Sequence, residues 1–317
     1  MTAIAPTSAP LRLDAGIRAV KGHGTENDFI IVIDPDDRFA WLGSEFAERV
    51  CDRRSGLGAD GVIRAARAPV GSGAGADGSA EPAWLMDYRN SDGSVGLMCG
   101  NGIRVMAEAL RRDGLAGADT LDVLTAAGPR RLHRRFPGVW AVEMGLVSVG
   151  VPDGSALDAA PGDTEVDTLV AVPGLGEAPR SGMSVDVGNP HVVVALTGLD
   201  ELAGLDLRHA PHLLPHPAEG ANVEFVAVLG YDGDAGTGRL AMRVHERGSG
   251  ETRSCGTGAV AAATAAAVWA GEGAPHRWSV DVAGGALEVE LEGGRAVLVG
   301  PAVIVADIVL DAGWLGG

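Results

Sequence analysis

Apolar residues occur along most of this chain in short runs, which are separated by turns rich in Gly, Pro and Asp. The first two runs predict strands at 17–20 and 29–33, joined by a polar turn at 22–28. Later runs predict strands at 121–125, 139–144, 184–187, 191–196, 223–228, 240–244, 278–282, 286–291 and 303–309. Because most of these strands follow one another without a helix between them, the pattern favours antiparallel sheet over a regular strand–helix alternation.

Three other segments have the apolar spacing of a helix. Ser44 is expected to be the N-cap of a short helix at 44–50, which has a one-sided apolar face. A second helix is expected after Cys99, because apolar residues between 103 and 110 recur at i, i+3, i+4 and i+7. The third, at 259–270, is apolar at nearly every position and is therefore expected to be buried on all sides.

The two longer predicted helices belong to an internal repeat. Each begins with a Cys-Gly-X-Gly sequence, at Cys99 and at Cys255. Gly128 follows Cys99, and Gly284 follows Cys255, at the same distance of 29 residues (128 − 99 and 284 − 255). A similar predicted hairpin comes after each of these glycines. The chain is therefore expected to be an α+β protein with two copies of one unit, each a helix inside a curved, mostly antiparallel sheet.

Composition limits the classes of protein that fit this pattern. The 317 residues allow two domains, and 46% hydrophobic with 21% charged residues indicates a globular chain with a sizeable core. A net charge of −17 argues against nucleic acids or anionic membrane surfaces as partners. The most apolar run is too short to cross a bilayer, and residues 1–10, read as a loose tail, do not resemble a signal peptide. A cytoplasmic protein is expected.

The chain has three cysteines, an odd number that suits a reducing compartment better than a disulfide framework. Cys51 follows the short helix without a special setting, so it is expected to be structural. Cys99 and Cys255 each stand directly before a helix, whose free N–H groups and positive dipole end favour thiolate over thiol. We therefore expect the pKa of both thiols to lie below the ordinary value of about 8.5.

Two such units facing each other would place two thiols across a cleft, with helix N-termini between them that can hold a carboxylate. This arrangement suits stereoinversion by two bases. One thiolate removes the proton from the carbon next to the carboxylate, and the opposite thiol delivers a proton to the other face. The chain has no lysine in a recognisable pyridoxal context and no nucleotide-binding loop, so a reaction without a cofactor is expected.

Five polar segments stand out along nearly the whole chain. The central one is Asn90-Ser91-Asp92-Gly93-Ser94, followed after four residues by Cys99-Gly100-Asn101-Gly102-Ile103-Arg104. The others are 22–29, 188–191, 221–223 and 246–252, of which the last leads to Cys255-Gly256-Thr257-Gly258. In this order, the five segments resemble the signature of the diaminopimelate epimerase family.

The resemblance implies interconversion of LL- and meso-2,6-diaminoheptanedioate, on the route to lysine and peptidoglycan, without pyridoxal phosphate. It also implies two pseudo-symmetric halves with the active site in the cleft between them. In this chain the halves would be 11–134 with 301–317, carrying Cys99, and 135–300, carrying Cys255. The final strand would return to the first half. The family further implies a homodimer with a small-molecule substrate.

The resemblance also assigns roles to particular residues. Cys99 and Cys255 take the two acid/base roles, and His191 and Glu246 tune them. The residues that match substrate-binding positions are Asn27, Asn90, Gly100, Asn101, Asn189, Asn222, Glu246, Arg247, Gly256 and Thr257. Those at the helix starts match positions that hold the carboxylate at the reacting centre. The planar guanidinium of Arg247 suits the distal carboxylate.

Some residues depart from the family or have a simpler explanation. Glu26 stands where many members have Gly, and Gly61 stands where some have Gln, so a contact from that Gln is not expected here. Segment 70–82 is rich in Gly, Ala and Ser and is expected to be an exposed loop without an assigned function. Asn27 and Asn90 would also suit ordinary turns, because Asn is common beside Gly and Asp.

A metal site is not expected. The three histidines that invite one are His209, His212 and His216, but the prolines among them prevent a regular helix that would align the rings. A solvated loop is the expected structure there.

Three other functions use the same residues. A proline or hydroxyproline racemase has the same two-thiol plan, but the additional Asn, Glu and Arg positions favour a substrate with a second amino-acid group. A thiol–disulfide redox protein is less favoured, because 156 residues separate Cys99 and Cys255 (255 − 99), whereas redox pairs are usually close in sequence. A binding module that has lost catalysis is disfavoured because both thiols are present.

Overall fold

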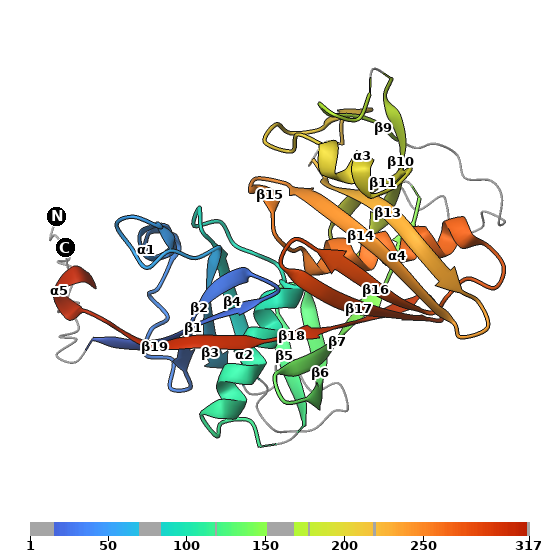
Figure 1. The fold of residues 1–317 in the computed structure, drawn as a ribbon. Helices are drawn as coiled ribbons and strands as arrows, with labels where there is room; N and C mark the ends of the chain where they lie inside the picture. Colours follow the sequence, from blue (N-terminus) through green and yellow to red (C-terminus); the bar gives the residue numbers. More distant parts are fainter. Residues whose placement is uncertain are drawn as a thin grey trace, which may run out of the picture.

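The computed structural model describes residues 16–69, 84–117, 119–150, 168–176, 178–217 and 220–315. The predicted loop at 70–82 and the predicted tail at 1–10 lie outside the described residues. The described chain forms two halves, each with one long helix against a curved sheet (Figure 1).

The elements of the first half are β1 (Ile17–Gly24), β2 (Asn27–Asp34), α1 (Ser44–Cys51), β3 (Gly61–Arg67), β4 (Trp84–Asn90), α2 (Gly100–Arg112), β5 (Thr120–Thr125), β6 (Gly128–Phe136) and β7 (Val139–Leu146), together with β19 (Val303–Leu310). A short helix, α5 (Ala312–Leu315), follows β19. The elements of the second half are β8 (Ser148–Val149), β9 (Thr168–Ala171), β10 (Arg180–Asp186), β11 (Pro190–Leu196), α3 (Leu199–Gly204), β12 (His212–Leu214), β13 (Asn222–Asp232), β14 (Thr237–Glu246), β15 (Gly250–Thr252), α4 (Gly256–Ala270), β16 (Arg277–Val282), β17 (Gly285–Glu292) and β18 (Arg295–Pro301).

The strands repeat one pairing order, which confirms the two pseudo-symmetric halves. From β1 to β7, neighbouring strands pair antiparallel, parallel, antiparallel, parallel, antiparallel and antiparallel. The series β10, β11, β13, β14, β16, β17 and β18 repeats this order. The sheet is mostly antiparallel, as expected. The exceptions are two parallel pairs in each half, which make it a mixed sheet.

Two pairings tie the halves together. Strand β7 pairs antiparallel with β18, its counterpart in the second half, so the sheet runs on from one half into the other. Strand β19 then returns to the first half and pairs with β1 from Ile17 to His23, which confirms the expected return of the final strand. The expected division at 134–135 falls inside β6, and its position stays a prediction.

The turn between the first two strands is tighter than expected. Strand β1 continues to Gly24 and β2 begins at Asn27, so Thr25 and Glu26 alone form the connection. Both have positive φ angles, 49° and 61°, which matches a two-residue hairpin turn. The predicted turn at 22–28 is therefore mostly strand, because hairpin pairing extends through its polar residues.

The two long helices lie at the centre of their halves. From Gly100 to Leu110, every residue of α2 is buried. Helix α4 is buried from Gly256 to Ala263 and again at Ala265 and Ala266, but its last turn exposes Val268 and Trp269. The prediction of burial on all sides is thus right except at the C-terminal end, where the helix leaves the sheet.

The short helix α1 differs in detail from its prediction. Its N-cap is Gly43, without a side-chain hydrogen bond, and Ser44 is the first helical residue, so the N-cap assignment was wrong. Cys51 ends this helix and is buried, and burial raises its pKa to about 12. This agrees with a structural role. Among the described residues, no helix has both the length and the apolar character needed to cross a membrane.

Candidate active site

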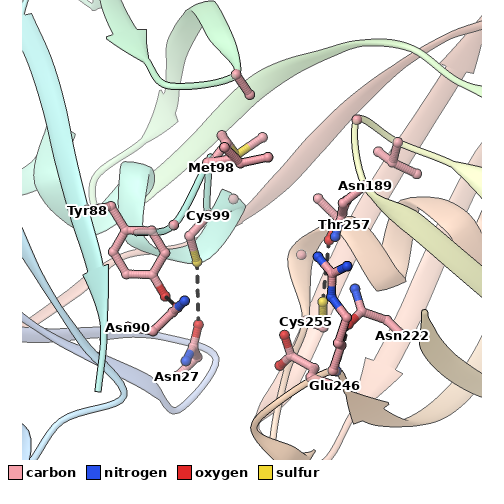
Figure 2. Close-up of a pocket in the computed structure, with 18 of the residues that line it drawn as sticks. Asn27, Tyr88, Asn90, Met98, Cys99, Asn189, Asn222, Glu246, Cys255 and Thr257 are labelled. Carbon is pink, nitrogen blue, oxygen red and sulfur yellow. Dashed lines mark hydrogen bonds between the residues drawn. The ribbon is translucent and has the colours of Figure 1, made fainter. Parts of the chain in front are cut away.

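Cys99 and Cys255 are the N-cap residues of α2 and α4. Each sulfur accepts a hydrogen bond at 3.4 Å from the backbone N–H three residues later, that of Gly102 or Gly258. Both thiols are free, and both line one cavity of about 180 Å³ between the halves. Figure 2 shows the two sulfurs on opposite sides of this cavity. The repeat found in the sequence therefore brings the two cysteines together, as predicted.

The cavity collects most of the predicted site residues. Those that line it are Cys99, Cys255, Asn27, Asn90, Gly100, Asn189, Asn222, Glu246, Arg247, Gly256 and Thr257. Two predicted residues, Asn101 and His191, are fully or almost fully buried and do not line it. Their side chains lie behind the residues that line the cavity.

The first half surrounds Cys99 with amide groups that are held by other side chains. Asn27 Oδ1 lies 3.7 Å from Cys99 Sγ, and Asn27 Nδ2 donates to Asp60 Oδ2 at 2.7 Å. On β4, Asn90 Oδ1 accepts a hydrogen bond of 2.6 Å from the hydroxyl of Tyr88 (Figure 2). Because each amide has a partner behind it, its orientation at the cavity is fixed.

Asn101 joins the two halves rather than facing a ligand. Its Nδ2 lies 3.1 Å from Asn27 Oδ1 and 3.3 Å from both the carbonyl and the hydroxyl oxygen of Ser254. Its Oδ1 accepts from the buried Arg104 at 3.0 Å. The backbone N–H of Asn101, in the first turn of α2, is the part left to act at the cavity.

The second half surrounds Cys255 with a carboxylate and a hydroxyl. Thr257 Oγ1 lies 3.5 Å from Cys255 Sγ, and Glu246 lines the same cavity as this thiol. Thr252 donates a short hydrogen bond to Glu246 Oε1. Burial raises the pKa of Glu246, which brings a carboxyl group that can hold a proton beside Cys255.

Three further predicted residues complete the second half of the site. Asn222 Oδ1 accepts a 2.9 Å hydrogen bond from the backbone N–H of Arg247, which fixes the turn after β14. Asn189 directly precedes β11, and its Oδ1 faces His191 Nε2 at 3.1 Å. No hydrogen bond joins His191 to either cysteine within the described part of the chain. Any effect of His191 on the site therefore passes through Asn189 or through charge.

The prediction of low thiol pKa values is wrong. Burial raises the pKa of Cys99 to about 11, although the N–H groups of Gly102 and Asn101 act in the opposite direction. Burial also raises the pKa of Cys255, and the Glu246 and Glu224 carboxylates raise it further. Helix N-termini do favour thiolate here, as expected, but the loss of water around the sulfur outweighs them.

The sequence did not single out Tyr88. Its ring lies in a narrow slot between Gly61 and Gly96, and its hydroxyl donates a hydrogen bond to Asn90. A Cβ at Gly61 would lie 2.7 Å from Tyr88 Cε2, and one at Gly96 would lie 2.1 Å from Cδ1. The ring therefore occupies the space beside Gly61, the position at which some family members have Gln. The spacing of residues along the sequence does not reveal this contact, because Gly61, Tyr88 and Gly96 come from different segments.

Glu26, which stands where many family members have Gly, makes a contact between the two halves. Glu26 forms an ion pair with Arg253, two residues before Cys255, and so connects the two halves at the rim of the site. The neighbouring Thr25 hydroxyl lies 2.5 Å from the Ser254 hydroxyl. The tight β1–β2 turn thus packs against the segment that leads into Cys255.

The three histidines considered for metal binding are exposed. His212 begins strand β12 rather than lying in a loop, because it pairs with β9. Among the described residues, no three His, Cys, Asp or Glu side chains form a group that could hold a metal ion.

A family model described as diaminopimelate epimerase matches residues 19–149 and 183–305, which include every predicted site residue. The chain belongs to the diaminopimelate epimerase family. A protein of that name from Rhodococcus jostii (strain RHA1) is 42% identical over 308 residues, which are 94% of this chain and 98% of its own. Another from Streptomyces coelicolor is 44% identical over 312 residues, 95% of this chain and 98% of its own.

Solved structures share the fold of this diaminopimelate epimerase family member at lower identity. A probable proline racemase from Agrobacterium radiobacter K84 has a TM-score of 0.61 at 16% identity, covering 93% of both chains. A hydroxyproline epimerase from Agrobacterium vitis has a TM-score of 0.60 at 14% identity, covering 94% of this chain and 93% of its own. At such identities the likeness establishes a common two-half fold and nothing about the substrate.

Proposed function

We propose that the protein is a diaminopimelate epimerase that interconverts LL- and meso-2,6-diaminoheptanedioate, in the synthesis of lysine and peptidoglycan precursors. The observation that carries this proposal is the pair of thiols that cap two equivalent helices and line one cavity from opposite sides. The relatives named diaminopimelate epimerase, at 40–44% identity over nearly the full chain, support the choice of substrate.

The reaction uses one sulfur as a base and the other as an acid. A thiolate takes the proton from the α-carbon, and its C–H electron pair passes to the carbon and the attached carboxylate. The opposite thiol then gives its proton to the other face, which inverts the centre and leaves that sulfur as a thiolate. The reverse reaction exchanges the two roles, so Cys99 and Cys255 act as a coupled pair. The acid and base both come from the chain, so no pyridoxal phosphate is required.

The two helix N-termini supply the carboxylate site. The backbone N–H groups of Gly100, Asn101, Gly256 and Thr257 stand in the first turns of α2 and α4, where the helix leaves N–H groups unpaired. Donors placed where negative charge grows in the transition state contribute about 3 kcal/mol each. This stabilisation lowers the barrier to proton removal from the α-carbon, which is only weakly acidic in a substrate that bears an ammonium group there.

Glu246 has a further role at Cys255. Its carboxyl group lines the same cavity as the Cys255 thiol, in a buried setting that raises the pKa of both groups. Glu246 is therefore placed to take the thiol proton when a thiolate is needed and to return it afterwards. Asn27, with its Oδ1 at 3.7 Å from Cys99, is the corresponding contact on the first side.

The remaining polar residues of the cavity bind the distal part of the substrate. Arg247 can hold the second carboxylate through two parallel N–H donors. The amides of Asn90, Asn189 and Asn222 line the same cavity and supply both donors and acceptors to an amino-acid group. A proline or hydroxyproline racemase activity is not favoured, because those substrates lack a second amino-acid group for these residues.

A cytoplasmic homodimer belongs to the same proposal. The odd number of cysteines, all free in the structure, suits a reducing compartment. The dimer rests on the family resemblance. Size-exclusion chromatography with light scattering would test it, and a monomeric mass would contradict it.

The experiment that tests the function is epimerisation in heavy water. With LL-diaminopimelate, a two-base enzyme should place deuterium in the meso product before it appears in recovered substrate. Cys99→Ser and Cys255→Ser should each lower the rate at least about a thousandfold while leaving the far-UV circular dichroism unchanged. Turnover of proline without turnover of diaminopimelate, or near-normal rates in either variant, would refute the proposal.

A further inference from the structure

Glu224 and His191 form an ion pair beneath the N-terminus of α4, with no exposed area on either side chain. Glu224 Oε1 lies 2.7 Å from His191 Nδ1, and the two residues come from the parallel strands β13 and β11. On its other side, His191 Nε2 faces Asn189 Oδ1 at 3.1 Å. The His191 ring thus connects a buried carboxylate to Asn189, which lines the cavity.

The carboxylate lies very close to the catalytic helix turn. A Cβ at Gly258 would come within 2.6 Å of Glu224 Oε1 and 3.3 Å of Cys255 Sγ. Glycine at position 258 is therefore what allows the carboxylate to lie beside the N-cap cysteine. Cys255 and Glu246 are the titratable groups of α4 and β14 that face this ion pair.

The first half shows that the fold does not need an ion pair at this place. Strands β2 and β3 correspond to β11 and β13 in the repeated pairing order. Phe29 pairs with Gly61 as His191 pairs with Asn222, and Ile63, two residues further on, takes the place of Glu224. A Cβ at Gly102 would meet Ile63 Cδ1 at 2.6 Å, as one at Gly258 would meet Glu224.

Packing alone would therefore favour the apolar pair in both halves. Two buried charges lose their water, and an apolar pair of similar volume is often as stable or more so. The second carboxylate oxygen of Glu224 is also buried without a hydrogen-bond partner among the described residues, which adds to the cost. Only the second half bears the free-energy cost of burying these polar side chains. This indicates that Glu224 and His191 have a role in the chemistry of the site.

The hydrogen bonds show what that role is. His191 Nδ1 lies 2.7 Å from Glu224 Oε1 and its Nε2 lies 3.1 Å from Asn189 Oδ1, so the ring is held between the buried carboxylate and the amide. With its oxygen against the His191 ring, Asn189 presents its NH2 group to the cavity.

We propose that Glu224 is a positioning residue, which holds the His191 ring in place and thereby fixes the Asn189 amide as a donor to a carboxylate of the substrate. This inference rests on the proposed function, because it requires an amino-acid substrate in the cavity. His191 then acts on the site through Asn189 rather than through a direct contact with a cysteine.

Steady-state kinetics with LL-diaminopimelate test the chain of contacts. Glu224→Gln is expected to raise KM about tenfold or more with a smaller change in kcat, because the Asn189 donor is no longer held in place. Asn189→Ala should have a similar effect, and the combined variant should be no worse than Asn189→Ala alone. Glu292→Gln, an exposed position on the β17–β18 hairpin, is the control for loss of one negative charge and should keep wild-type constants. Additive losses, or an unchanged KM in Glu224→Gln, would overturn the proposal.

A second variant separates this role from folding. The pair His191→Phe with Glu224→Ile copies the first half, so it should melt at or above the wild-type temperature and still show the raised KM. Nitrogen-15 NMR of histidine-labelled protein should show a protonated Nδ1 at His191, hydrogen-bonded to Glu224 and identified by the signals lost in that variant. A wild-type His191 without a proton on Nδ1 would overturn the proposal. An inactive wild type would instead refute the proposed function.

Discussion

Gly100 and Gly256 touch where α2 and α4 meet. A Cβ added to Gly256 would lie 3.3 Å from the Cα atom of Gly100 and 2.9 Å from Leu298 Cδ2. Neither glycine has a positive φ angle, so their small size is what the contact requires. Because Cys99 and Cys255 directly precede these glycines, the contact sets how far apart the two sulfurs stand.

Gly256→Ala should therefore harm activity more than stability. The added methyl group overpacks the contact, at a cost of about 1–3 kcal/mol, and moves the helix ends apart. A shift of the thiols by a fraction of an ångström should lower kcat/KM by about tenfold to a hundredfold. The measurement is kcat/KM together with the melting temperature. Gly117→Ala, where a Cβ meets nothing within 4 Å, is the control, and an unaltered kcat/KM in Gly256→Ala would contradict the argument.

The raised pKa of Cys99 predicts how its reactivity depends on pH. An acid whose pKa is raised to about 11 keeps its proton at neutral pH, so about one Cys99 in ten thousand is a thiolate at pH 7. Alkylation by iodoacetamide needs the thiolate, so its rate should rise about tenfold per pH unit between pH 7 and 10. Mass spectrometry of the Cys99 peptide measures this rate in protein without substrate. A plateau below pH 8.5 would mean that the helix N-terminus outweighs burial after all.

Tyr88→Phe should weaken the site without unfolding it. The variant keeps the ring in its slot but removes the donor to Asn90 Oδ1, so the Asn90 side chain is held only by the hydrogen bond from its Nδ2 to Ser94 Oγ. We expect KM to rise by about threefold to tenfold and stability to fall by about 1 kcal/mol. Tyr231→Phe removes the hydroxyl of the other tyrosine, which is exposed, and should leave the kinetics as they are. Equal effects in the two variants would remove Tyr88 from the site.

Arg247→Ala should act mainly on substrate binding. Losing a bidentate partner for the distal carboxylate is expected to raise KM about a hundredfold, with a smaller fall in kcat because the thiols stay in place. Arg239→Ala, an exposed arginine on β14 that pairs with Asp281, is the matched control. If KM stays constant in Arg247→Ala, the distal carboxylate binds elsewhere.

The sequence predicted the parts of the site that depend on local patterns. Equal spacing after Cys99 and Cys255 led to two equivalent helices, and the structure places each cysteine at an N-cap with the same 3.4 Å hydrogen bond. The return of β19 to β1 was also expected. In each case the signal lies within a few neighbouring residues or in a repeat.

Features that depend on distant strands were not predicted. Glu224 gives no signal in its own segment, because it meets His191 only when β11 and β13 pair in parallel. The slot for Tyr88 needs Gly61 and Gly96 at once. The thiol pKa values were wrong because the helix dipole can be read from sequence, whereas the depth of burial that opposes it cannot.

The return of β19 to the first half has a consequence for synthesis on the ribosome. Strand β1 pairs with β2 on one edge and with β19 on the other, and β19 leaves the exit tunnel only after the whole second half. Until then the nascent first half exposes the unpaired N–H and C=O groups of β1, a surface open to wrong partners. This edge of β1 therefore stays without its partner strand for as long as translation takes to reach Val303–Leu310.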